Sequence, residues 1–129
     1  METNKKTLLL VDDNLEIGAR LGKLLLLEGY NSRYASSGKE AVRIYRESKE
    51  VIDIVVLDLV MPDMNGVEVF EALKEMNPDV KVLIASGNIA DGTIKQMLDA
   101  GALGFVRKPY LFEEITKEVN RILEISKRK

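Results

Sequence analysis

Short apolar runs alternate along this chain with longer stretches in which apolar residues recur every three or four positions. The short runs have the length of strands buried on both faces, and the longer stretches have the spacing of helices with one buried face. Strands are predicted from such runs at 7–11, through 55–57, at 81–85 and at 104–107, and a strand is also predicted at 30–35, where the pattern is polar. Because a helical pattern follows each run, the sequence predicts five parallel strands covered by helices on both sides.

The helical stretches carry recognisable end signals. Asn14 is predicted to cap the first helix, which ends at Gly29, and Ser37 with Glu40 has the spacing of a capping box for the second. Gly101 is expected to close the fourth. The positions expected to face the core are Ile17, Leu21, Leu24 and Leu25; Ala41, Val42, Ile44 and Tyr45; Val69, Phe70, Leu73 and Met76; Ile94, Met97 and Leu98; and Leu111, Ile115, Val119 and Ile122.

Polar side chains stand where four of the five predicted strands end. Asp12 and Asp13 follow the first strand, Asp58 the third, Ser86 the fourth and Lys108 the fifth. The carboxyl ends of parallel strands share one edge of the sheet, where α/β proteins place their ligand crevices. Each residue alone also fits a structural role in a cap, a turn or a surface loop. Their ordered coincidence at four strand ends predicts a common site.

Three carboxylates at this edge point to a metal. Each pair would repel by roughly 4 kcal/mol at about 4 Å and an effective dielectric near 20, so an empty site is costly. Oxygen ligands favour a hard cation, and Mg²⁺ takes few protein oxygens while keeping several waters. The expected Mg²⁺ ligands are Asp13 and Asp58, with Asp12 direct or through water and the backbone carbonyl near Val60.

The remaining groups at the edge suit phosphoryl transfer. Lys108 offers a positive charge and Ser86 a hydroxyl to the oxygens of a phosphoryl group. Asp58 is the expected nucleophile, giving an acyl phosphate, because it stands alone on the central strand while the Asp12 and Asp13 pair holds the metal.

Composition narrows the possible chemistry. The 129 residues include no cysteine and no histidine, which excludes disulfides, thiolate or imidazole metal ligands and an internal phosphohistidine. The formal charge of −2 gives no general attraction for nucleic acid, and the apolar runs are too short for a membrane span. We expect one cytoplasmic domain over 1–129, with a loose N-terminus at 1–6 and a basic tail at 126–129.

These residues resemble the receiver domain of the two-component response-regulator family, chemotaxis regulators included, over essentially the whole chain. The resemblance implies a doubly wound, flavodoxin-like α/β fold, (βα)5, with strand order 2-1-3-4-5. The matching pieces are Asp12-Asp13, Asp58 within Leu57–Pro62, Asn65-Gly66, Ser86 and Lys108-Pro109.

The resemblance implies roles for the acidic cluster and for Lys108. Asp58 corresponds to the phosphoacceptor, Asp12 and Asp13 to the metal pair, and Lys108 to the lysine that pairs with the phosphate. A partner histidine kinase or histidine phosphotransfer protein would donate the phosphoryl group. In this family the peptide bond before the residue matching Pro109 is often cis.

A switch is implied as well. Ser86 resembles the switch hydroxyl and Phe105 the switch aromatic, which would repack the surface of the fourth helix, fifth strand and fifth helix for a downstream effector of unknown identity. Phe105 also fits a plain core position. Val60 and Asn88 occupy the positions that tune phosphate lifetime, and Leu111 replaces the usual cap of the last helix.

Three other functions fit parts of this pattern. A metal-dependent phosphohydrolase of the dehalogenase type also uses a strand-end Asp, but Val60 stands where its second Asp belongs. A flavodoxin-like cofactor carrier would need a Ser/Thr-rich phosphate loop in place of the acidic edge. A phosphorylation-independent adaptor would keep the fold without the chemistry. We expect a signalling phosphoacceptor, not an enzyme, either free-standing or cut from a longer protein.

Overall fold

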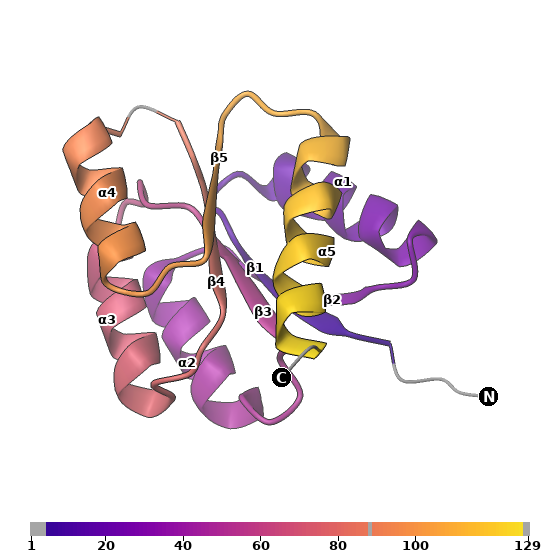
Figure 1. Cartoon of the computed structure of the whole chain (residues 1–129), viewed down its shortest axis with the longest axis horizontal. Coiled ribbons are helices and arrows are strands. Elements are labelled where there is room, and N and C mark those ends of the chain that lie inside the picture. Colours follow the sequence, from indigo (N-terminus) through magenta and orange to yellow (C-terminus); the bar gives the residue numbers. More distant parts are fainter. Residues whose placement is uncertain (1–4, 88, 128–129) are drawn as a thin grey trace.

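A computed structural model describes residues 5–87 and 89–127. One parallel sheet runs through it in the order β2-β1-β3-β4-β5, which confirms the predicted fold class and strand order (Figure 1). Residues 1–4 of the predicted N-terminal segment, residues 128–129 of the predicted tail and Asn88 lie outside the described residues. The strands are β1 (Thr7–Val11), β2 (Asn31–Ala35), β3 (Ile54–Leu57), β4 (Val82–Ser86) and β5 (Gly104–Arg107).

Two layers of helices cover the sheet. In Figure 1, α1 and α5 lie over one face, and α2, α3 and α4 lie over the other. No helix in the described ranges is both long and apolar enough to pass through a membrane. The helices are α1 (Leu15–Leu27), α2 (Gly38–Ser48), α3 (Gly66–Met76), α4 (Asp91–Asp99) and α5 (Phe112–Lys127).

The three central strands, β1, β3 and β4, are mostly continuous apolar runs because successive side chains enter opposite layers. Leu8 and Leu10 of β1 pack with α1 and α5, whereas Leu9 and Val11 pack with the other three helices. All four residues of β3 are buried. Burial on both faces requires an apolar residue at every position, so a polar side chain is accommodated only where a strand ends.

Helix ends follow the predicted signals, with one exchange. Ser37 caps α2, but Glu40 accepts from the backbone and hydroxyl of Ser36 and not from the Ser37 N–H, so the predicted capping box is only half formed. A complete box starts α3 instead, where Asn65 and Glu68 each accept the other's backbone N–H. The sequence analysis named Asn65 only together with Gly66 and did not identify Glu68 as its partner.

Two core predictions were wrong, and both fail at the edge of an apolar stripe. Leu98 is 41% exposed because the short helix α4 reaches the core only through Ile94 and Met97. Leu111 is 68% exposed because α5 begins one residue later, at Phe112, so Leu111 lies outside its buried face. The other named stripe residues of the described helices are buried or half-buried.

Glycine and proline features match expectation. Gly29 and Gly101, which follow α1 and α4, have φ angles of 92° and 121°, values that L side chains rarely adopt. The Lys108-Pro109 peptide bond is cis.

The second strand begins at Asn31, one residue later than predicted, and α5 continues through Lys127, so the predicted tail begins inside a helix.

Candidate functional site

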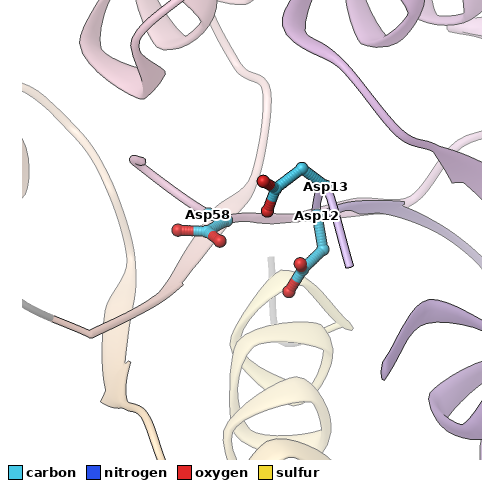
Figure 2. Close-up of side chains that lie close together, drawn as sticks. All are labelled: Asp12, Asp13 and Asp58. Carbon is cyan, nitrogen blue, oxygen red and sulfur yellow. The ribbon is translucent and has the colours of Figure 1, made fainter. Parts of the chain in front are cut away.

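The three aspartates meet because β1 and β3 are neighbours in the sheet. Val11 pairs with Leu57 at the last rung, which places Asp12 and Asp13 beside Asp58. Figure 2 shows their side chains projecting from these adjacent strand ends, and one carboxylate oxygen of each lies within 4.8 Å of the others. Asp12 and Asp58 are buried, whereas Asp13 is exposed.

Lys108, at the end of β5, reaches into the acidic group. Its Nζ lies 2.6 Å from Asp12 Oδ2 and 2.9 Å from Asp58 Oδ2. Burial lowers the pKa of Lys108, but hydrogen bonds to the two carboxylates outweigh this effect and leave the pKa above its ordinary value. The side chain is therefore a fixed ammonium group shared by two carboxylates.

The second oxygen of Asp58 is also fully engaged. Asp58 Oδ1 accepts the hydroxyl of Ser86 at 2.8 Å and the backbone N–H of Val60 at 3.0 Å. Ser86 has no exposed surface, and its hydroxyl oxygen accepts the Leu59 N–H at 3.3 Å. Hydrogen bonds thus fix the rotamer of Asp58 and tie β4 to the loop after β3.

The start of α3 is pressed against the backbone that carries Asp58. Gly66 N donates to Leu59 O at 2.9 Å. A Cβ at Gly66 would lie 2.4 Å from Leu59 Cα and 3.0 Å from Asp58 O, closer than packing allows. Glycine is therefore required by the close approach of two backbones.

Asp63 ties the loop between β3 and α3 to the start of α2. Its two carboxylate oxygens accept the backbone N–H groups of Gly38 and Lys39, each at 3.0 Å, at the start of α2. Hydrogen bonds from the Lys39 and Gly38 amides are the main cause of the lowered pKa of Asp63. The loop that follows Asp58 is thus held by both α2 and α3.

The structure brings five of the predicted site residues together through their side chains. Asp12, Asp13, Asp58, Ser86 and Lys108 converge on one edge, as their strand-end positions predicted. The remaining three are Val60, which is 55% exposed, Phe105, which is half-buried against the α2–α4 core, and Asn88, which lies outside the described residues.

Two residues beside the site, Arg107 and Tyr34, make contacts that had no signal in the sequence. Arg107 donates from Nη1 to Gly87 O at 3.1 Å, and its Nη2 lies 3.2 Å from Asp91 Oδ1, so it links β5 to the segment leading into α4. Its guanidinium lies 5.2 Å from the ring centroid of Phe105. Tyr34 donates its hydroxyl to the backbone carbonyl of Asp12.

The donor set fits a hard divalent cation. Three carboxylates offer oxygens within 4.8 Å of one another, and the exposed one opens the group to solvent. An oxygen-only set with few protein ligands is the kind that Mg²⁺ prefers. The same edge carries an ammonium and a hydroxyl, the groups needed to bind phosphoryl oxygens.

A groove of about 620 Å³ opens beside Lys108, between α1 and the segment that links β5 to α5. Its lining combines apolar side chains with three cationic ones and so suits a partner surface that is apolar with acidic groups. The lining includes Ile17, Arg20, Leu21, Leu24, Arg107, Lys108, Pro109, Tyr110 and Phe112.

Known proteins are similar to this chain over most of its length. The family model described as the response regulator receiver domain matches residues 8–120. Chemotaxis protein CheY of Thermotoga maritima is 30% identical over 91% of this chain and 97% of its own length. Sensor kinase CckA of Brucella abortus is 35% identical over 92% of this chain, which spans only 12% of that kinase.

Solved structures are also similar to this chain over most of its length. A response regulator receiver domain protein from Clostridium thermocellum superposes with a TM-score of 0.89 at 27% identity, covering 95% of this chain and 97% of that one. A chain of the CheX-CheY-BeF3-Mg²⁺ complex from Borrelia burgdorferi superposes with a TM-score of 0.87 at 29% identity, covering 92% and 89%.

Proposed function

Because this chain belongs to the family of response regulator receiver domains, we propose that it accepts a phosphoryl group on Asp58 and signals by the change of surface that follows. The donor is a phosphohistidine on a histidine kinase or a histidine phosphotransfer protein. The observation that carries the proposal is the setting of Asp58, a buried carboxylate with Lys108 at 2.9 Å on one oxygen and Ser86 at 2.8 Å on the other.

The transfer uses groups already in contact. An oxygen of Asp58 forms a bond to phosphorus while the phosphorus–nitrogen bond to the donor imidazole breaks, and the imidazole keeps the bonding pair. As this bond forms, the ammonium of Lys108 and the hydroxyl of Ser86 move from the carboxylate to phosphoryl oxygens. Both contacts strengthen as charge gathers on those oxygens, which is the condition for lowering the barrier.

Asp12, Asp13 and Asp58 would hold Mg²⁺ together with the backbone carbonyl of Val60. When bound, the ion supplies positive charge for the phosphoryl oxygens and offsets the repulsion among the carboxylates. Support comes from the three oxygens within 4.8 Å of one another and from the similarity to a chain of the Borrelia burgdorferi complex, which includes Mg²⁺ and BeF3.

The phosphodonor is proposed to dock over the groove between α1 and the segment after β5. This groove includes Lys108 in its lining, so a partner seated there lies next to the nucleophile. Its apolar side chains give a partner area to bury, and Arg20 and Arg107 favour acidic groups at the contact.

The signal is proposed to leave through Ser86 and Phe105. Once the hydroxyl of Ser86 turns to the phosphoryl group, the Leu59 N–H loses its acceptor and the loop after β3 is freed to adjust. Phe105 then repacks and alters the surface of α4, β5 and α5 for an effector protein. Val60 and Asn88 are proposed to set the lifetime of the phosphoryl group.

Labelling of Asp58 tests the proposal. With acetyl phosphate and Mg²⁺, intact-mass spectrometry is expected to show one added phosphoryl group on the wild type and on Asp79→Asn, an exposed aspartate away from the site. Asp58→Asn is expected to lose the label, because an amide cannot act as the nucleophile. Labelling of Asp58→Asn at the wild-type level would refute the assignment, and steady release of phosphate from small esters would favour a phosphohydrolase.

A further inference from the structure

Tyr34, on edge strand β2, packs against α1 and reaches the backbone of the acidic group on the neighbouring strand. Its hydroxyl donates to the Asp12 carbonyl oxygen, and its half-buried ring packs with the α1 and α5 core. Tyr34 contributes no ligand atom to the site. Its contact is with the peptide group that joins the two aspartates.

The two peptide groups that flank the Asp12 Cα are both held by hydrogen bonds to β2. Asp12 N donates to Ala35 O at 3.1 Å, and Asp12 O accepts the Tyr34 hydroxyl. The carbonyl of Asp12 and the N–H of Asp13 belong to one planar unit. Anchoring the carbonyl therefore restricts the direction in which the Asp13 side chain projects from the backbone.

Gly18 in α1 makes room for the ring of Tyr34. A Cβ at Gly18 would lie 2.3 Å from Tyr34 Cε1 and 2.6 Å from Cδ1, so any larger residue would displace the ring. Glycine inside a helix is less favourable than alanine by roughly 0.5–1 kcal/mol. The contact with the Tyr34 ring therefore explains why a glycine stands at position 18 of the chain, inside a helix.

We propose that Tyr34, seated on Gly18, is a positioning residue for the divalent-cation site. It holds the Asp12-Asp13 peptide so that both carboxylates stay directed at Asp58. The inference rests on the proposed function, because it assumes that these aspartates bind Mg²⁺. It assigns no chemistry to the phenol itself.

Magnesium affinity of Tyr34→Phe tests the inference apart from phosphorylation. The variant keeps the ring and loses the hydroxyl, so Mg²⁺ binding followed by the amide NMR shifts of residues 12–14 is expected to weaken by about 10-fold. Labelling by acetyl phosphate should recover at saturating Mg²⁺. Tyr30→Phe is the matched control, since Tyr30 donates to Asn120 and not to the site.

Gly18→Ala gives an independent route to the same loss. The added methyl group displaces the ring, so this variant should also bind Mg²⁺ more weakly, and adding Tyr34→Phe to it should cost little more. Equal affinities in the wild type and Tyr34→Phe, or additive losses in the double variant, would overturn the inference alone. A wild type without Mg²⁺ binding would overturn the proposed function and the inference together.

Discussion

Lys108 serves the site in its metal-free state as well as in the proposed reaction. Its ammonium lies within 2.9 Å of two carboxylates whose neighbour, Asp13, adds a third charge. The contacts are only partly exposed, so solvent screens them less than a surface ion pair. The lysine therefore offsets part of the repulsion that a cation would otherwise have to relieve.

Removing this ammonium should destabilise the metal-free protein. Lys108→Met leaves two buried carboxylates without their partner, and the free energy of unfolding in EDTA is expected to fall by about 2 kcal/mol. Saturating Mg²⁺ should restore a large part of the loss. Urea denaturation checks both values. Lys95→Met is the control, because the exposed pair with Asp99 should contribute under about 1 kcal/mol. A deficit unchanged by Mg²⁺ would contradict this role.

Individual residues were predictable where the strand pattern fixed their place. Asp58 and Lys108 each end an apolar run, and parallel topology brings such ends together. Asp63 and Tyr34 were missed because their partners lie more than twenty residues away, on amides and a carbonyl that leave no trace in the sequence. Tertiary hydrogen bonds to the backbone have no side-chain pattern to read.

Helix α4 starts without a side-chain cap. Its N-cap residue is Ala90, which provides no side-chain acceptor, and Gly92 lies in its first turn. Arg107 partly compensates through its contacts with Gly87 and Asp91. Because α4 lies next to the proposed switch, a loosely started helix suits an element that has to change its packing.

A better cap should stabilise this helix. Ala90 has the extended conformation of a capping residue, with φ −64° and ψ 142°, so Ala90→Ser should accept an orphan N–H and raise stability by about 1 kcal/mol. Hydrogen exchange of the α4 amides should slow. The contrasting variant is Gly101→Ala, which forces a side chain into φ 121° and should destabilise. Unchanged exchange in Ala90→Ser would show that the missing cap does not limit α4.

Elements were predictable in number and type, and less so at their edges. The apolar pattern identified the helices and the other four strands, because burial on one or two faces leaves a repeating pattern, whereas β2 has a polar pattern. The misplaced capping box arose because Ser37 and Glu40 have the correct spacing, while the structure turns the glutamate to Ser36. Spacing alone does not determine which of two adjacent amides a carboxylate accepts.

Across the whole molecule, the titratable groups with raised pKa values all change charge at alkaline pH. Burial is the main cause of the raised pKa in Tyr30, Tyr34, Tyr45 and Tyr110, and carboxylate hydrogen bonds raise that of Lys108. No histidine or cysteine is present to titrate near neutrality. Stability should therefore depend little on pH around neutrality.

Alkaline pH should destabilise the protein through deprotonation of these tyrosines and of Lys108. A group whose pKa is higher in the folded state stabilises the fold at every pH below its pKa in the unfolded state, which is near 10.0 for tyrosine and 10.5 for lysine. That stability is lost as the pH rises through the pKa of the folded state. The urea midpoint should stay level from about pH 6 to 9 and then fall above about pH 10. A midpoint that shifts between pH 6 and 8 would contradict this account.

The ion pair between Lys108 and Asp12 joins residues 96 positions apart, and this separation matters during synthesis. A nascent chain leaving the ribosome carries its acidic residues well before the lysine that neutralises them emerges. The cluster of Asp12, Asp58 and Lys108 is therefore completed only after β5 has been synthesised and has docked. A chain that stops before β5 would lack the ammonium that pairs with Asp12 and Asp58.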